Sequence, residues 1–129
     1  MACFIVPAAE AVVTKVIEAA EEKKEKETGV TAGETARAGI PMSCKFRWLT
    51  WMLTGGAVLL MFEHIWHGEV VPWFPFLTAM SDPSEAAAMF GEMATAGVCM
   101  ALLISAVWFI MCKAADSIVS RKAVETEAQ

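Results

Sequence analysis

The sequence predicts an all-α integral membrane protein: a transmembrane helical hairpin preceded by an amphipathic helix that could itself be a third span. The chain has 129 residues, of which 57% are hydrophobic and 19% charged, with a mean hydropathy of +0.50. A domain this small has too much surface for its volume to hide that apolar area from water, whereas lipid can cover it. Residues 48–62 and 93–112 carry no charge. The second run has the length of about 20 residues that crosses a bilayer, and the first approaches it together with its flanks.

The distribution of charge and cysteine limits the possible functions. The net charge is −5 and no basic patch is present, which argues against a nucleic-acid partner. The four cysteines, Cys3, Cys44, Cys99 and Cys112, form no CxxC pair. We expect four free thiols, with Cys99 in mid-membrane and the other three at the cytoplasmic side, where thiols stay reduced.

Residues 1–27 are predicted to form an amphipathic helix. Val12, Val13, Val16 and Ile17 recur at helical spacing, and Pro7 suits a first turn. Three placements are open: in the membrane interface, against another protein, or across the membrane as a third helix. Spanning would bury Glu10 and Lys15, at about 2.5–3.5 kcal/mol each in mid-bilayer, and would make Glu10 a functional candidate. Residues 28–42 are then a cytoplasmic linker rich in glycine and charge.

Residues 43–122 are predicted to form the hairpin, with spans at about 46–66 and 91–112 and an outer loop at 67–82. Gly68 should end the first helix, and Pro72 and Pro75 exclude regular structure from the aromatic loop that follows. Asp82, Pro83 and Glu85 have the positions of an N-cap, a first helical residue and a capping-box partner. Residues 123–129 should be a frayed tail.

The basic residues predict the topology. Lys45 and Arg47 precede the first span and Lys113 follows the second, while no Lys or Arg lies between Trp48 and Cys112. The positive-inside rule therefore places both hairpin ends in the cytoplasm and the loop outside. We expect a multi-pass protein of the cell membrane, and short spans flanked by Lys and Arg suit a bacterial inner membrane.

Small residues mark one face of each span. Such faces let membrane helices approach closely, so we expect the two to pack on each other. Two helices alone leave much surface uncovered, so the predicted partners are the lipid bilayer and either another membrane protein or a second copy. The first face consists of Thr50, Thr54 and Ala57, and the second of Gly97, Ala101 and Ser105.

One cluster of side chains could bind a ligand or a proton, and it lies at the predicted outer boundary of the membrane. It comprises Glu63, His64, His67 and Glu92. Imidazole and carboxylate together can bind a transition metal, and a histidine from a second copy would allow haem; contact with a proton, a ligand or a partner is also open. Anchoring of the helix end at the interface is the simplest interpretation. The order Glu-His-x-x-His is not the zincin order His-Glu-x-x-His, so no protease is predicted.

The sequence as a whole favours a small non-enzymatic membrane protein, acting as a subunit or accessory of a larger complex or as a homo-oligomer. No nucleotide loop or catalytic triad is present, and no cofactor is expected. The alternatives are a metal- or haem-binding membrane protein that uses the outer His/Glu cluster, and a small transporter or channel component. The last needs a polar path, which only Glu10 could provide.

Overall fold

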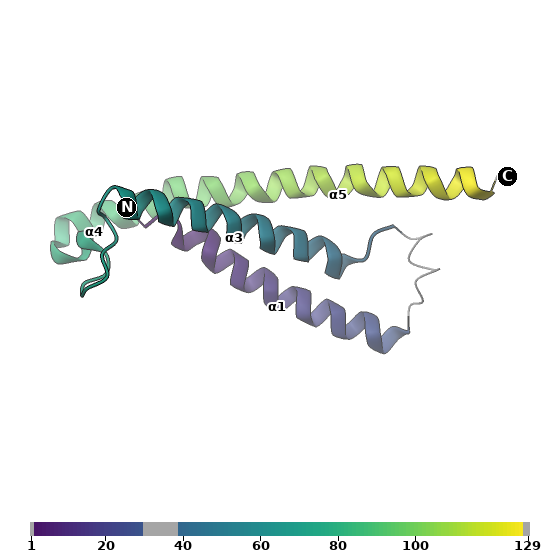
Figure 1. Ribbon diagram of the computed structural model, residues 1–129, viewed down its shortest axis with the longest axis horizontal. Coiled ribbons are helices and arrows are strands. Elements are labelled where there is room, and N and C mark those ends of the chain that lie inside the picture. Colours follow the sequence, from purple (N-terminus) through teal and green to yellow (C-terminus); the bar gives the residue numbers. More distant parts are fainter. Residues whose placement is uncertain (1, 30–38, 128–129) are drawn as a thin grey trace.

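A computed structural model describes residues 2–29 and 39–127, with side chains as far as residue 121. This part of the chain is helical without a β-strand, which confirms the expected all-α class. Three long helices lie side by side (Figure 1). α1 (Ile5–Thr28) runs antiparallel to α3 (Met42–Trp66), and α5 (Val98–Glu127) runs in the same direction as α1. The linker residues 30–38 lie outside the described part.

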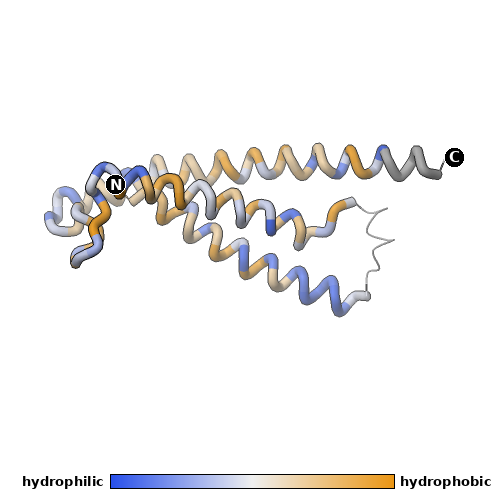
Figure 2. Tube along the Cα trace, viewed as in Figure 1, coloured by the Kyte–Doolittle hydropathy of each residue, from blue (hydrophilic) through white to orange (hydrophobic). Residues whose placement is uncertain are grey.

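α1 begins and ends where local chemistry allows. Pro7 stands in the first turn, where its missing N–H removes no helical hydrogen bond. Gly29 ends the helix with φ 63°, a left-handed conformation that glycine adopts without a Cβ clash. Charged residues gather in the second half of α1, as Figure 2 shows. α1 therefore has one apolar half and one solvated half along its axis.

α3 follows Pro41 and ends at Trp66, where Gly68 turns the chain with φ 72°. The loop beyond it is stabilised by an isolated bridge between Val70 and Leu77, and its Phe74–Pro75 peptide bond is cis. A short 3₁₀ helix, η1 (Thr78–Ser81), completes the loop. Three aromatic side chains of the loop are exposed: Trp73, Phe74 and Phe76.

The second predicted helix is continuous but has three parts: α4 (Pro83–Glu92), a π-helical turn η2 (Met93–Gly97) and α5. The Asp82 carboxylate accepts hydrogen bonds from the Ser84 backbone N–H at 2.8 Å and its hydroxyl at 2.6 Å, so the predicted N-cap is confirmed. The backbone stays helical to Glu127, beyond residue 123 where a frayed tail was expected.

Two clusters form the small core. One lies between the three long helices and contains Ala11, Leu49 and Leu53, with Phe46 and Trp108 packed against it. The other joins the N-terminus to the loop and α4 through Ala2, Ala79 and Met89. The N-terminal residues therefore lie at the loop end of the molecule.

The opposite end is joined by polar contacts. Lys45 pairs with Asp116 at 2.7 Å, and the indole N–H of Trp108 donates to the Lys45 carbonyl at 2.7 Å. The Ser43 hydroxyl donates to Glu25 at 2.7 Å. These contacts connect α3 to α5 and to α1 beside the cations that predict the cytoplasmic side.

Most apolar side chains of the long helices face outward. Among the described residues, two helices are long and apolar enough to cross a membrane, Met42–Trp66 and Pro83–Arg121. Only 22% and 17% of their most apolar 18-residue windows are buried within the protein. A helix at the core of a soluble protein would be mostly buried, so these surfaces need a cover that the chain itself does not supply.

Candidate functional site

A line of polar side chains runs along α1 where it faces the other two helices. Glu10, Thr14 and Glu18 are spaced four residues apart, and such residues share one helix face. Thr50 of α3 and Ser105 of α5 meet this face. We call these five residues the polar seam.

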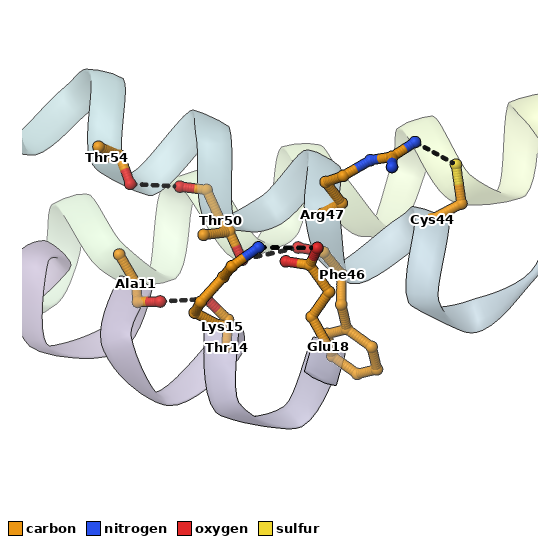
Figure 3. Close-up of polar contacts among 9 residues, drawn as sticks. All are labelled: Ala11, Thr14, Lys15, Glu18, Cys44, Phe46, Arg47, Thr50 and Thr54. Carbon is orange, nitrogen blue, oxygen red and sulfur yellow. Dashed lines mark hydrogen bonds and ion pairs between the residues drawn. The ribbon is translucent and has the colours of Figure 1, made fainter. Parts of the chain in front are cut away.

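The seam is hydrogen-bonded between helices. The Ser105 hydroxyl donates to Glu10 Oε1 at 2.8 Å. The hydroxyls of Thr14 and Thr50 lie 3.1 Å apart, and each also reaches a carbonyl of its own helix. Figure 3 shows the threonines facing each other between α1 and α3. Polar side chains thus join α1 to both neighbours.

Glu18 is the most deeply buried charge of the seam, with 2% of its surface exposed. Its Oε1 accepts from the Lys15 ammonium at 3.0 Å, a contact drawn in Figure 3. Its Oε2 has no hydrogen-bond partner among the residues that the structure describes. A buried carboxylate oxygen without a partner is costly, and binding a proton would remove its charge.

Glu10 lies near the middle of the bundle. A Cβ placed on Gly56 would approach Ile104 Cδ1 to 3.1 Å, so Gly56 and Ile104 are at the same level. Gly56 is the midpoint of the span predicted at 46–66, and Ser105 follows Ile104. The Glu10 carboxyl is therefore level with the centre of that span.

A second group of polar side chains closes the loop end of the bundle. His64, with 6% exposure, has its Nε2 3.3 Å from Cys3 Sγ and 3.8 Å from a Glu69 carboxylate oxygen. Its Nδ1 lies 2.6 Å from the Leu60 carbonyl, which can only accept. Nδ1 therefore carries a proton and donates to this carbonyl, while Nε2 faces the Cys3 thiol.

The Cys3 thiol is held protonated. Burial raises its pKa, and the carboxylates of Glu63 and Glu92 act in the same direction. A protonated thiol is a hydrogen-bond donor and a poor nucleophile. The Cys3–His64 pair in this state ties the N-terminus to α3 and is not an activated nucleophile.

The sequence placed Cys3 and Cys44 at the same side of the membrane, whereas the structure places them at opposite ends of the bundle. Cys3 contacts His64 at the loop end, whereas Cys44 lies beside Arg47 at the other end of α3. The reason is that α1 runs antiparallel along the whole of α3, which carries its first residues to the far end. All four cysteines are free thiols.

The predicted metal ligands differ in burial, although Glu63 and Glu92 lie near enough to Cys3, the partner of His64, to raise its pKa. His64 points into the bundle, while Glu63, His67 and Glu92 are exposed. Within the described residues, no group of three or more His, Cys, Asp or Glu side chains is close enough to hold a metal ion. The metal site stays a prediction without geometric support from this part of the chain.

The small-residue faces of the two predicted spans were expected to pack on each other. In the structure, residues of both faces contact α1. Thr50 meets Thr14, Ser105 meets Glu10, and Gly97 lies under Val6 and the Cys3 carbonyl. Ala57 and Ala101 are buried, but Thr54 is exposed. Small residues allow close packing with any neighbouring helix, and here α1 packs against them.

A groove of about 510 Å³ runs between α1 and α3 on the outside of the bundle. Small and apolar side chains line it, among them Ala8, Ala11, Thr54 and Ala57, with Lys15 also at its wall. Its chemistry resembles that of the rest of the apolar surface, so it adds no polar ligand group to the seam.

Comparison with known protein families, curated proteins and solved structures found no match for this chain. Its function must therefore be inferred from its own geometry. Sequence reasoning gave Glu10 a conditional role and missed Thr14 and Glu18. Their signal was the four-residue spacing of polar side chains on the face of the helix opposite Val12 and Val16.

Proposed function

We propose that this chain is a small, non-enzymatic integral membrane protein whose three long helices all lie in the bilayer. One observation supports it: the valines of α1 face outward, while Thr14 and Glu18 of the polar seam face the other helices. Val12, Val13 and Val16 are 66%, 57% and 65% exposed, whereas Thr14 and Glu18 are 5% and 2% exposed. Lipid stabilises this arrangement, because it covers the outward apolar side chains and offers no hydrogen bonds to polar side chains, which therefore face inward.

The topology follows from the charges. Both hairpin ends and the charged half of α1 lie in the cytoplasm, and the loop with Trp73 and Phe74 lies in the outer headgroup layer. The antiparallel packing of α1 on α3 then places Cys3 outside. A bacterial inner membrane suits spans of this length.

Within the membrane, the chain acts as a subunit or accessory of a larger complex or as a homo-oligomer. Its described residues form no catalytic constellation that would support an enzyme acting alone. The outward faces of α3 and α5 provide surface for a partner. In membranes, close packing between helices takes the place of the hydrophobic effect as the driving force.

The test is purification in a gentle detergent from the native membrane, after washing with alkaline carbonate. We expect the protein to stay in the membrane and to purify as a homo-oligomer or with a stoichiometric partner, without metal. Release by carbonate would contradict a spanning protein. Bound metal that is lost in a His64→Gln/His67→Gln double variant would favour the metal-binding alternative, and a His67→Gln variant separates the exposed histidine from the buried one.

A small transporter or channel component is the second candidate, and the polar seam favours it. Membrane helices rarely bury carboxyl groups without a role, because an ionised carboxyl is unfavourable in the bilayer centre. Glu10 lies at the middle level of the bundle and Glu18 nearer its cytoplasmic end.

A further inference from the structure

We propose that Glu10 is a proton-binding site inside the membrane, loaded from the cytoplasmic side through Glu18. This inference rests on the proposed placement of α1 in the bilayer. Glu10 would exchange a proton at the level of Ser105, and the Thr14 and Thr50 hydroxyls stand between the two carboxyl groups. The functional class is then a proton-coupled membrane component.

The first argument is the position of Glu10. An ionised carboxyl is unfavourable at mid-bilayer, and protonation removes that charge. Ser105 fits both states, because its hydroxyl donates to the carboxylate, as at 2.8 Å here, and accepts from the protonated acid. The pair is therefore suited to gain and lose a proton without rearranging the helices.

The second argument is the unpartnered oxygen of Glu18. Its side chain is 3% exposed and lies on the same face of α1 as Glu10, about 12 Å away along the helix axis at 1.5 Å per residue. Lys15 neutralises Oε1, while Oε2 has no partner among the described residues. Glu18 thus offers a buried acceptor nearer the cytoplasmic end, where a proton would enter.

The surroundings of Glu10 contain few other titratable groups. α3 carries none between Trp48 and Phe62, and α5 carries only Cys99 between Met93 and Met111. On its own helix the nearest charges are Lys15 and Glu18. The facing helices therefore carry no cation at the level of Glu10 that could neutralise it. Its charge can be removed by binding a proton.

Glu18 has more charged neighbours on the turns that face it. Lys45 of α3 is bound by Asp116 of α5, and the Arg47 guanidinium lies beside Cys44. Lys113 of α5 lies over the Phe109 ring. Each of these cations has a contact of its own, so Lys15 is the cation that the structure pairs with Glu18.

A proton fits the site better than a metal cation. Hard cations such as Ca²⁺ take about six or more oxygen ligands. The polar contact seen at Glu10 is one hydroxyl, and no cluster of ligating side chains occurs among the described residues. From Glu10 toward the outer end, the chain carries no polar side chain until Cys3, which meets His64, and Val6 packs on Gly97 in between. This favours loading from the cytoplasmic side.

The test is carbodiimide labelling of the full-length protein in its native membrane, read by peptide mass spectrometry. A protonated carboxylic acid adds its O–H across a carbodiimide C=N bond, and the adduct rearranges to a stable N-acylurea. We expect dicyclohexylcarbodiimide, which partitions into lipid, to label Glu10 and to label it less as pH rises. Label should be lost in Glu10→Gln, whose amide oxygen still accepts from Ser105.

Further variants test the route. Glu18→Gln should slow labelling of Glu10 severalfold. Glu27→Gln, on the same helix but exposed and paired with Lys23, is the matched control and should leave the rate unchanged. Ser105→Ala removes a hydrogen-bond donor to the ionised Glu10 carboxylate and so favours the protonated form. Labelling of Glu10 should therefore persist to higher pH in this variant than in the unchanged protein.

The contrary outcomes are separable. Absence of label at Glu10, in protein that resists carbonate and excludes a water-soluble carbodiimide, would overturn the proton site and leave the membrane placement intact. Equal labelling of Glu10 by the water-soluble reagent would place α1 in water and overturn both. Protection of Glu10 by Na⁺ or Ca²⁺ at constant pH would replace the proton by a metal cation.

Discussion

At the scale of single residues, His64 connects the N-terminus to the bundle. Its imidazole is fixed on both sides, by the Leu60 carbonyl at 2.6 Å and by Cys3 Sγ at 3.3 Å, and the Phe4 ring meets it edge-on. The sequence singled out His64 for its chemistry, yet its contacts are those of a satisfied buried histidine. Its partner Cys3 could not be predicted, because the pair is joined only when α1 lies along the full length of α3.

The raised pKa of Cys3 gives a prediction about its reactivity. Burial stabilises the protonated thiol, so alkylation of Cys3 should require a higher pH in the folded protein than in the same protein unfolded in SDS. The folded state gains from this protonation below the ordinary thiol pKa of 9.0 and loses the gain as pH rises above it. Alkylation rates followed by mass spectrometry across pH 7–11 would measure both curves. Coincident curves would mean that Cys3 is not buried against His64.

At the scale of elements, the position of α1 depends on which of its faces meets protein. The sequence left open whether the valine stripe of residues 12, 13 and 16 would meet the membrane interface, another protein or the lipid core. The face of α1 that is buried against the other helices carries Ala11, Thr14 and Glu18. Periodicity identifies two faces, but it does not tell which one lipid covers. The long apolar runs and the Asp82 cap were predictable because they depend on local sequence alone.

The close approach of α1 to the π-helical turn depends on Gly97. A Cβ there would lie 2.9 Å from both the Cys3 carbonyl oxygen and Val6 Cγ2, and the backbone oxygen cannot move aside alone. We expect Gly97→Ala to destabilise the protein by about 1–3 kcal/mol, as overpacking typically does. Unfolding in detergent, followed by circular dichroism during an SDS titration, would measure the change.

Gly91 is the matched control for this substitution. It lies in the same continuous helix, and nothing is within 4 Å of a Cβ added there. Gly91→Ala should therefore be neutral or stabilise by roughly 0.5–1 kcal/mol through reduced backbone entropy. Equal effects of the two substitutions would show that α1 does not pack on Gly97.

At the scale of the whole molecule, the three long helices form a bundle with outward apolar faces and an inward polar seam. The sequence was sufficient for the helical class and the two apolar helices. It was not sufficient for the seam, because Glu10, Thr14 and Glu18 acquire partners only from helices that are distant in sequence. A conditional role for Glu10 could be predicted, since a carboxyl within an apolar stretch is expensive wherever that stretch enters lipid.

The three-helix membrane placement and the proton site both depend on α1 lying inside the bilayer. Cysteine accessibility tests this directly. In a background with the four native cysteines changed to alanine, Thr14→Cys probes the buried face and Val13→Cys the outward face. Lys23→Cys, at a side chain that is 80% exposed, is the reference for a solvated position.

A membrane-impermeant maleimide is added to right-side-out and to inverted vesicles. We predict labelling of the Lys23 variant from the cytoplasmic side only, and none of the Thr14 or Val13 variants from either side until detergent is added. Labelling of the Thr14 variant as fast as the Lys23 variant would place α1 on the membrane surface with its polar face in water, and would contradict the account.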